Sequence, residues 1–477
     1  MSENNQNIFS NLSKYNNRIA LYENDRLSYT YKDILKFGNE FSFLKKEKSL
    51  AVILCDNTFE TVSAYVNLIR YNQTVFLLNN QLEEIFFLKI IKKYNPKYLF
   101  LSKNFKINLI KNFYKIKKRF KHNLFCELKK NKNYKIYKKL SLLLMTSGST
   151  GSPQTVRISN QNLKSNTEAI CNYFKINMKD RVITTLPMNY TLGLSIINTH
   201  LNKGASITLT NHTLVQKEFW NLLNKNKITT FTGVPFTFEI LKRILPEKKY
   251  FSNLKYITQA GGKLNPILVK YFENLFSKNK IKFYIMYGQT EATARMSILN
   301  YKKVSKNLES IGNVIKGGKF FIIDDKKKLI KKNNTIGELV YRGKNVSLGY
   351  ADNFLDLNKR DENCGVLKTG DISYKDKNNL FFIVGRKKRF IKINGVRINL
   401  ESVEDIFKQQ NLECACKGED DKLEIYVIKQ QFSEKIFKNT LKKLNIRSTN
   451  VRLYKINKMP RNQSGKIIYK NLTNNNV

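Results

Sequence analysis

The chain has 477 residues, of which 42% are apolar and 12% aromatic, which is enough for two or three domains with large cores and excludes an intrinsically disordered chain. The net charge is +48, from 85 Lys and Arg against 37 Asp and Glu, but these residues form no single dense tract. Because Lys, Asn, Ile, Tyr and Phe share A/T-rich codons, we attribute the charge to composition and expect no specific nucleic-acid partner, with a nucleic-acid or membrane-surface binder as the alternative.

The sequence shows no signal for export or membrane insertion. No apolar run approaches the ~18 residues that a membrane helix needs, and the first ten residues, MSENNQNIFS, lack the basic flank and apolar stretch of a secretory signal. The six cysteines are scattered, as in proteins with reduced thiols, and three histidines give poor support for a metal site. We therefore predict a cytoplasmic protein without a membrane span.

Short apolar runs alternate with helical patterns along most of the chain, which is typical of α/β architecture. In residues 160–174, the side chains of Leu163, Ala169, Ile170, Tyr173 and Phe174 have helical spacing. The predicted elements of this part are strands at residues 49–57, 141–146 and 281–287, a helix at 160–174, and a more antiparallel group of strands at 319–324, 337–343 and 379–393.

The pattern changes after about residue 385. Residues 389–410 are predicted to form a hairpin and a helix, residues 422–429 a strand, and residues 433–444 a second helix with Ser433 as its N-cap. We therefore predict an α/β fold with a large N-terminal domain of several subdomains at residues 1–386, followed by a small α+β domain at residues 387–477.

The first candidate site is the stretch TSGSTGSPQ, residues 146–154, which follows a predicted strand. A loop that leaves a strand and leads into a helix can aim backbone N–H groups at an anion, and Gly148 and Gly151 would allow close approach. Ser147, Ser149 and Thr150 add hydroxyl donors. The glycine spacing differs from that of P-loop proteins, so a phosphate-binding loop and an ordinary Ser/Gly turn both stay open at this point.

Three other loops carry single charged residues of interest. In YGQTEATARMS, residues 287–297, Glu291 could hold Mg²⁺ against nucleotide phosphates and Tyr287 could stack on a base, with a solvated or N-capping acid as the alternative. Asp371, in LKTGDIS, could accept hydrogen bonds from ribose hydroxyls or could occupy a simple turn. Lys466, in MPRNQSGKIIY, is by itself one lysine among many.

Taken together, these stretches resemble the adenylate-forming superfamily of acyl- and aryl-CoA synthetases, luciferases and peptide-synthetase adenylation domains. That family shows, in order, a TSGSTGxPK loop, a YGxTE loop, a TGD aspartate, a GRxxxxIK..G hinge region and a P+..SGK lysine. This chain has TSGSTGSPQ, YGQTE, TGD, GRKKRFIKING and PRNQSGK in the same order. The resemblance runs from about residue 10 to the end, and it implies an AMP-dependent ligase whose small C-terminal domain is mobile.

The resemblance implies a binding role for several residues. The adenine would be flanked by Tyr287 and Gly288. Gly261 and Gly262 would lie beside the adenine and the acyl pocket, and the ribose would be bound by Asp371 with Arg386 close by. The β- and γ-phosphates of ATP would be held by Thr146, Ser147, Gly148, Ser149, Thr150 and Gly151.

It also implies how the reaction would be divided between two conformations. Thr290 would contact the α-phosphate, Glu291 would bind Mg²⁺, and Lys466 would reach the substrate carboxylate and the α-phosphate. Lys388 matches the hinge about which the small domain rotates, and Asn394 and Gly395 would face the thiol channel after that rotation.

The sequence also indicates which residues would line the acid pocket. LPMNYTLGLSIINTH, residues 186–200, matches the stretch that lines it, with Asn189, Tyr190 and Gly193 as candidate pocket residues. No acidic residue lies between Asp180 and Glu218, so a substrate ammonium would lack a charge partner there. We expect a fatty, hydroxy-acyl, aryl or other small carboxylic acid without an α-ammonium.

The implied function is an ATP- and Mg²⁺-dependent ligase that forms an acyl-adenylate and passes the acyl group to CoA or to the phosphopantetheine of an acyl carrier protein. One alternative is an amino-acid-activating carrier-protein ligase. The other is a catalytically weak binding paralogue, which Gln154 supports because the family usually has lysine at this position.

Overall fold

The computed structural model describes residues 7–23, 27–130, 134–146, 154–244, 246–393, 396–444, 446–461 and 465–472. The chain divides into two compact units. The first includes the described residues up to Thr146, together with Gln154–Phe320 and Tyr341–Leu367, and the second includes Phe321–Val340 and the described residues from Lys368 onward.

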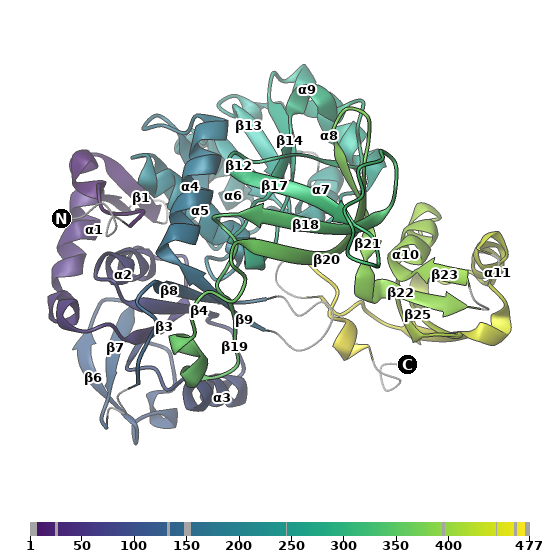
Figure 1. The fold of residues 1–477 in the computed structure, drawn as a ribbon. Helices are drawn as coiled ribbons and strands as arrows, with labels where there is room; N and C mark the ends of the chain where they lie inside the picture. The colour runs from purple at the N-terminus through teal and green to yellow at the C-terminus, as the bar shows by residue number, and fades with distance from the viewer. Residues whose placement is uncertain are drawn as a thin grey trace. The chain divides into compact units, whose positions relative to one another are not determined.

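The first unit contains a mixed sheet whose middle strands run parallel (Figure 1). Neighbours are parallel from β14 to β1, whereas β15, β16 and β2 pair antiparallel. In spatial order the strands are β16 (Ser310–Val314), β15 (Ser297–Leu299), β14 (Lys282–Tyr287), β13 (Tyr256–Gln259), β12 (Thr230–Gly233), β10 (Arg181–Ile183), β11 (Ser206–Leu209), β1 (Ile19–Glu23) and β2 (Leu27–Thr30).

Helices cover both faces of this sheet. Phe283 of β14 packs against Phe238 with 5.4 Å between ring centroids, and the next residue, Tyr284, packs against Phe174 at 5.1 Å. Because neighbouring strand residues point to opposite faces, the helices that carry Phe238 and Phe174 lie on opposite sides. The helices around this sheet are α4 (Asn160–Phe174), α5 (Thr191–Asn202), α6 (Lys217–Lys225), α7 (Pro235–Ile244), α8 (Pro266–Lys278) and the short α9 (Tyr301–Val304).

Helix α4 confirms the helix predicted at residues 160–174. Ser159 caps it, because its hydroxyl accepts a hydrogen bond from the Asn162 N–H while the Asn162 side chain accepts from the Ser159 N–H. Leu163, Ala169 and Ile170 are buried as expected. Tyr173 is partly exposed, and it accepts a hydrogen bond from the Asn300 side chain at its hydroxyl.

Helices α4 and α5 press against the sheet through one apolar group of residues, which we call the α5 cluster. Tyr190 and Phe174 pack against its edge. Its buried members are Ala169, Ile170, Leu186, Leu192, Val234, Tyr256, Ala260, Tyr284, Met286, Ile298 and Ile315. This cluster therefore joins the candidate acid pocket at residues 186–193 to the strands β12, β13 and β14.

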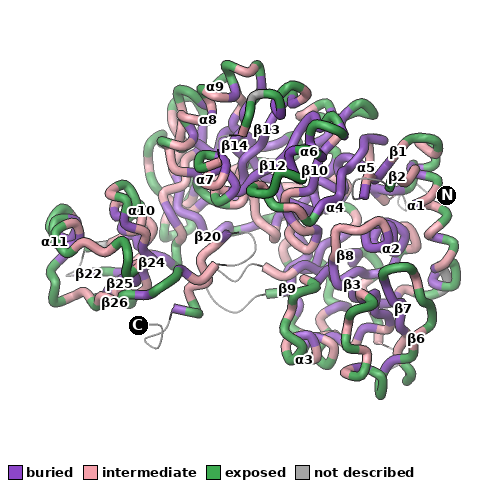
Figure 2. Tube along the Cα trace, turned by 180° about the vertical axis from the view of Figure 1, so that it is seen from behind, coloured by how far each residue is buried: buried purple, intermediate pink, exposed green. Residues whose placement is uncertain are grey.

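A second sheet of the first unit has helices on both faces as well. Along β3, Ala51 and Ile53 belong to the core of α2, whereas Val52 and Leu54 belong to the core of α3. Figure 2 shows β3 and β8 buried. The strands in spatial order are β19 (Gly349–Ala351), β9 (Thr155–Ser159), β8 (Leu140–Met145), β4 (Thr74–Asn79), β3 (Leu50–Cys55), β5 (Tyr98–Ser102), β7 (Asn123–Leu128) and β6 (Tyr114–Arg119), and the helices are α1 (Tyr31–Asn39), α2 (Phe59–Arg70) and α3 (Glu84–Tyr94).

Strand β9 carries a fully buried arginine. The Arg157 side chain is 0% exposed, pairs with Glu362, and donates hydrogen bonds to the carbonyl oxygens of Leu348, Tyr350 and Lys359. A buried guanidinium is tolerated when its donors are satisfied in this way. Arg157 therefore fixes β9 to a segment that lies about 190 to 205 residues further along the chain.

The second unit confirms the predicted antiparallel strands and the α+β region after residue 385. Its last part has an apolar core that contains Val403 and Phe407 of α10 and Phe437 and Leu441 of α11, which Ser433 caps. Three strands have residues in both units: β17 (Gly318–Ile323), β18 (Gly337–Gly343) and β20 (Val366–Lys375). The other elements are β21 (Phe381–Arg386), β22 (Phe390–Ile393), β23 (Val396–Asn399), α10 (Leu400–Gln409), β24 (Cys414–Glu419), β25 (Lys422–Ile428), α11 (Glu434–Lys443) and β26 (Val451–Ile456).

The α/β prediction is therefore confirmed. The predicted boundary between residues 386 and 387 falls inside the second unit and stays a prediction. All six cysteines carry free thiols, and only Cys364 is exposed. Within the described ranges, no helix combines the length and the apolar composition needed to cross a bilayer.

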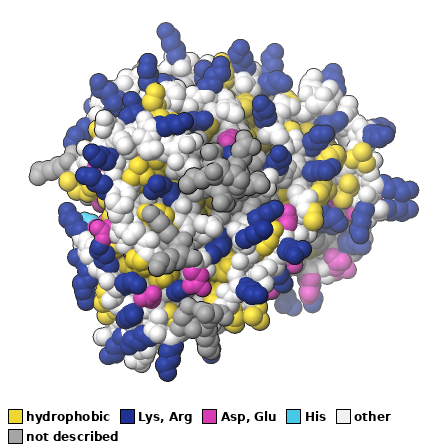
Figure 3. All heavy atoms as spheres, turned by 60° about the vertical axis from the view of Figure 1, so that its left-hand side comes forward, with side chains coloured by type: hydrophobic (Ala, Val, Ile, Leu, Met, Phe, Trp, Pro, Cys, Tyr) yellow, Lys and Arg dark blue, Asp and Glu magenta, His cyan; other side chains and the backbone are white. Residues whose placement is uncertain are grey.

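Lysine and arginine side chains are spread over the face seen in Figure 3, with fewer acidic residues between them. On this face the basic side chains are dispersed rather than gathered into one patch.

Candidate functional site

Strands β8 and β9 hold the two ends of the predicted phosphate loop together. The Thr146 N–H donates to the Gln154 carbonyl at 2.8 Å, and the Gln154 N–H donates to Thr146 Oγ1 at 3.1 Å. The expectation that this loop leads into a helix was wrong, because the antiparallel strand β9 lies between the loop and α4. Ser147, Gly148, Ser149, Thr150 and Gly151 lie outside the described residues.

The YGQTE loop begins where β14 ends at Tyr287. A Cβ atom on Gly288 would lie 1.7 Å from the Ala294 carbonyl oxygen, so only glycine allows the chain to cross itself here. Thr293 takes a left-handed conformation with φ of 66°, and its hydroxyl donates to the Asn345 carbonyl at 2.6 Å. The Asn345 side chain in turn donates to the Ala292 carbonyl at 2.8 Å. The loop is thus fixed in shape on both sides of Glu291.

Thr290 and Glu291 each touch a residue from a distant part of the first unit. The Thr290 and Thr191 hydroxyl oxygens are 2.8 Å apart, and Thr191 is the first residue of α5. The Tyr350 hydroxyl donates to Glu291 Oε1 at 3.0 Å. The first contact brings the YGQTE loop directly beside the candidate acid pocket.

The candidate pocket residues contact the glycines of the ITQAGG stretch. Gly261 has φ of +85°, and a Cβ there would lie 2.9 Å from the Tyr190 hydroxyl oxygen. Gly262 lies beside Pro235, and its carbonyl accepts from the Gln259 side chain at 2.8 Å. Tyr190 therefore faces the start of the loop after β13, as expected for neighbours in one pocket.

Two more features shape this end of α5. A Cβ on Gly193 would lie 2.4 Å from the Pro187 carbonyl oxygen, so glycine lets α5 approach the turn before it. The Oδ1 atom of Asn189 is buried and accepts no hydrogen bond within the described part of the protein. A polar substrate group can satisfy such an acceptor.

The carboxylate of Glu291 fits a Mg²⁺ ion that arrives with a nucleotide. Among the described residues, no group of three or more His, Cys, Asp or Glu side chains could hold a metal by itself. Mg²⁺ prefers one or two carboxylates together with phosphate oxygens and water. A single half-buried carboxylate beside a predicted phosphate site is consistent with that preference.

Asp371 and Arg386 belong to the second unit, where they face each other across β20 and β21. Arg386 Nε lies 2.7 Å from Asp371 Oδ1, and the Asp371 side chain is only 2% exposed. The Asp371 N–H donates to Thr369 Oγ1 at 3.1 Å. The carboxylate is therefore held in one orientation, as a group that binds two hydroxyls would need to be.

The predicted hinge residue lies between two anchored neighbours. Lys387 pairs with Glu338 at 2.8 Å. On the other side, Arg389 is buried and pairs with Glu404 of α10 at 2.6 Å. Lys388 itself is exposed. Consecutive side chains thus point to different parts of the second unit, and the backbone turns at Lys388.

Lys466 is half-buried in the last described segment, after Gly465, whose φ is +77°. Arg461 donates to the Gly465 carbonyl and pairs with Glu413, which ties this turn to the start of β24. Asn394 and Gly395 fall outside the described residues, so the predicted thiol channel is not seen here.

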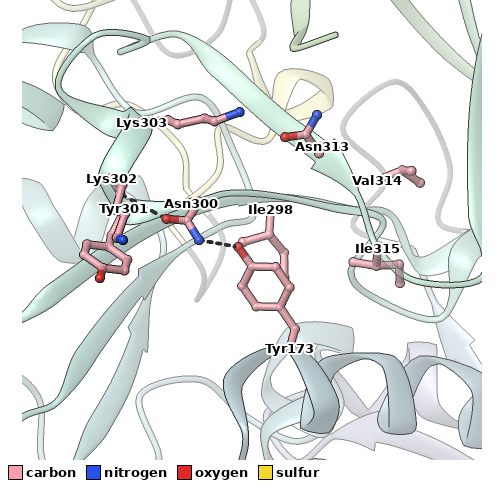
Figure 4. A pocket seen from close by; sticks show the side chains of 9 residues that line it. All are labelled: Tyr173, Ile298, Asn300, Tyr301, Lys302, Lys303, Asn313, Val314 and Ile315. Carbon is pink, nitrogen blue, oxygen red and sulfur yellow. Dashed lines mark hydrogen bonds between the residues drawn. The ribbon is translucent and has the colours of Figure 1, made fainter. Parts of the chain in front are cut away.

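Two of the surface pockets in the first unit lie away from the residues singled out above. One, of about 440 Å³, is lined by side chains of β15, β16 and α9 together with Tyr173, which points toward Asn300 (Figure 4). Another, of about 630 Å³, lies at the carboxyl ends of β3, β4 and β5. Neither contains a predicted site residue. We give more weight to the contacts that join the YGQTE loop to α5, because they connect the chemically informative side chains.

Sequence reasoning missed several partners in the site. Thr191, Asn345 and Tyr350 hold the YGQTE loop from positions that no local pattern connects to it. Arg295 was also missed, although its sequence signal is visible: it is a lone charge in the otherwise small and apolar stretch after Glu291.

Comparisons with known proteins agree with this arrangement. The family model for "AMP-binding enzyme" matches residues 8–351. The chain is 30% identical over 265 residues to oxalate–CoA ligase of Arabidopsis thaliana, covering 54% of this chain and 50% of that protein. It is 26% identical over 275 residues to the D-alanine–D-alanyl carrier protein ligase of Bacillus licheniformis, covering 55% and 53%. The chain thus spans about half the length of these curated relatives.

The fold is similar to that of o-succinylbenzoate CoA synthetase from Bacillus subtilis in complex with its acyl-adenylate intermediate. The TM-score is 0.80 at 18% identity, and the match covers 98% of both chains. The same enzyme has been solved with ATP and magnesium ion. This likeness confirms the predicted fold class over nearly the whole chain.

Proposed function

The chain belongs to the AMP-binding enzyme family of adenylate-forming enzymes, and from this premise we propose that it is an ATP-dependent ligase that joins a carboxylic acid to a thiol. The acid and ATP would give an acyl-adenylate and pyrophosphate, and the thiol would then displace AMP to give a thioester. The contact between Thr290 and Thr191 carries the proposal, because it sets the YGQTE loop against the candidate acid pocket.

The chemistry needs placed charge rather than a nucleophilic side chain. When a carboxylate attacks the α-phosphorus, two anionic groups approach each other, so donors and cations must stand where charge builds up. In our proposal, Thr290 donates to an α-phosphate oxygen and Lys466 bridges the carboxylate and the α-phosphate. Glu291 would hold Mg²⁺, which neutralises phosphate charge when bound.

The thiol acceptor is CoA or the phosphopantetheine of a carrier protein. The relatives support both classes, since one is named as a CoA ligase and the other as a carrier protein ligase. The amino-acid-activating alternative is weakened by residues 181–217, which contain no acid that could pair with an ammonium.

The alternative of a weak paralogue rests on Gln154. Its side chain is exposed, and its backbone is bonded to Thr146. Replacing a lysine by this residue would remove one cation from the phosphate loop but would not remove Glu291, Asp371 or Lys466. We therefore favour an active enzyme.

ATP–pyrophosphate exchange with a panel of fatty, hydroxy, aryl, dicarboxylic and amino acids tests the proposal. We expect Mg²⁺-dependent exchange with at least one acid that lacks an α-ammonium, and none above background with amino acids. The no-acid reaction is the control. Exchange with amino acids alone would favour the amino-acid-activating alternative, and a protein that binds no ATP would contradict the proposal.

Changing Asp371 to asparagine tests the ribose contact. Losing the charged acceptor should raise the KM for ATP about tenfold or more, the scale of one charge-assisted hydrogen bond. We expect 2′,3′-dideoxy-ATP to show a similar weakening with the unchanged protein, and no further weakening with Asp371→Asn. If the KM increase caused by Asp371→Asn and the increase caused by 2′,3′-dideoxy-ATP add fully, Asp371 does not bind the ribose hydroxyls.

A further inference from the structure

Arg295 is a buried cation just beyond the YGQTE loop. A Cβ atom on Gly288 would lie 2.8 Å from the Arg295 Cα, so the Arg295 backbone lies against the YGQTE loop. The residue is 5% exposed, and the Asn166 side chain donates to its carbonyl at 2.8 Å. A guanidinium stays charged in proteins, so burying it is costly unless an anion or several acceptors satisfy it.

The described part of the chain offers Arg295 no counter-ion. In the described ranges, no carboxylate forms an ion pair with it, and its Nε atom is buried without an acceptor. Burial lowers the pKa of Arg295 to about 10, and the nearby groups that oppose this shift are the phenol of Tyr256 and the thiol of Cys171. Arg157, which is equally buried, has Glu362 and three carbonyl oxygens around it.

A second buried side chain in the same region has one polar atom without a hydrogen-bond partner among the described residues. His200 of α5 is 4% exposed, and its Nδ1 lies 2.9 Å from the Ile196 carbonyl oxygen, so Nδ1 carries the proton. Burial lowers the pKa of His200 to about 4, and Arg295 contributes to the shift. His200 is therefore neutral near pH 7, and its Nε2 acceptor has no donor within the described residues.

Arg295 is linked to the candidate acid pocket through the YGQTE loop. Tyr256, whose phenol is among the groups that interact electrostatically with Arg295, belongs to the α5 cluster together with Leu192 and Ala260, and Tyr190 packs against it. The Arg295 backbone lies against Gly288, and Thr290 of the same loop contacts Thr191 at the start of α5, so the buried arginine belongs to the segment that borders the candidate acid pocket.

We propose that Arg295 is the counter-ion for a second carboxylate on the substrate, so that the enzyme activates a dicarboxylic acid. One carboxylate would react at the α-phosphate of ATP, and the other would accept hydrogen bonds from the guanidinium. The inference rests on the proposed function. It also agrees with the absence of acids from residues 181–217, since a pocket with a net positive charge favours dianions and disfavours ammonium groups.

Matched pairs of acids test this assignment. ATP–pyrophosphate exchange is measured with succinate against butyrate, glutarate against valerate, and adipate against hexanoate, which differ only in the terminal group. In at least one pair, the unchanged protein should prefer the dicarboxylate by about tenfold or more in kcat/KM. With Arg295→Met, that preference should fall by about 10- to 100-fold, the scale of a lost charge-assisted hydrogen bond, while the monocarboxylate keeps its kcat/KM.

Two further variants and one binding measurement complete the design. Arg295→Lys keeps the charge without the planar fork and should restore part of the preference. Arg243→Met, the same change at an exposed arginine of α7, should leave both acids unaffected. The preferred dicarboxylate should raise the Tm of the unchanged protein more than its monocarboxylate does, and this difference should vanish in Arg295→Met.

Several results would overturn the assignment. One is a preference of the unchanged protein for the monocarboxylate in every pair, a comparison that holds even if Arg295→Met does not fold. Another is an equal loss of both acids in Arg295→Met, as expected if Arg295 only holds a water together with His200. No exchange with any acid would instead contradict the proposed function itself.

Discussion

Replacing Lys466 by alanine is expected to slow acyl-adenylate formation by on the order of 10²-fold or more. The estimate is the usual loss when one preorganised donor to a developing charge is removed. In our proposal the Lys466 ammonium stands between the substrate carboxylate and the α-phosphate, where both reactants are negative, so its removal raises the barrier of the first half-reaction alone.

Two assays separate the half-reactions. ATP–pyrophosphate exchange reports adenylation, and thioester formation from chemically prepared acyl-adenylate reports the thiol step. We expect Lys466→Ala to lose the first activity and to keep most of the second, because the small domain would have rotated Lys466 away by then. Lys470→Ala, at an exposed lysine four residues later, should affect neither. Equal losses in both assays would reject the rotation.

Changing Arg389 to methionine is expected to destabilise the part of the second unit that follows Lys388 by about 3–5 kcal/mol. That is the usual cost of leaving one partner of a buried ion pair alone. Glu404 accepts from Arg389 at 2.6 Å, from the Cys416 N–H at 2.6 Å and from the Tyr469 hydroxyl at 3.1 Å, so it joins α10, β24 and the last described segment. Hydrogen exchange of residues 400–472 measures the loss.

The pH dependence of this variant provides a second check. Burial raises the pKa of Glu404, and Arg389 is the main group that opposes the shift, so the pKa should rise further in Arg389→Met. A carboxyl with a raised folded pKa keeps a proton that the unfolded chain releases, so stability falls as pH rises above about 4.5. The deficit of the variant should therefore be larger at pH 8 than at pH 5.

The matched control is an exposed ion pair of the same unit. Lys422 and Glu419 lie 3.0 Å apart with side chains 63% and 73% exposed. Pairs of this kind contribute at most about 1 kcal/mol, so Lys422→Met should leave hydrogen exchange almost unchanged. A similar loss from both substitutions would show that Arg389 has no special role.

Local signals explain which elements could be predicted from the sequence. Helix α4 could be predicted because its apolar stripe, from Leu163 to Phe174, is local in the sequence, whereas its cap at Ser159 was found only in the structure. Strand β9 was missed because TVRIS holds a charge in its middle, and nothing near Arg157 indicates that its partners come about 190 residues later.

The same distinction between local sequence signals and long-range contacts holds for the candidate site. The order of short motifs identified the YGQTE loop, Asp371 and Lys466, because each motif is contiguous. The contacts from Thr191 and Tyr350 join segments 59 to 99 residues apart, and only the fold brings them together. Arg295 is visible in the sequence as a lone charge among small and apolar residues, but its importance is clear only from its burial, since an arginine on a surface would need no explanation.

During synthesis, Arg157 of strand β9 cannot form its ion pair and hydrogen bonds until the residues around Glu362 have left the ribosome. Arg157 precedes that partner by 205 residues, which corresponds to about 10–40 s at ordinary rates of translation. For that time, the growing chain presents the edge beside β8 with an unsatisfied guanidinium and unpaired backbone groups. Open edges of this kind pair readily with other chains, so the nascent protein should be a client of chaperones well before Lys466 has been made.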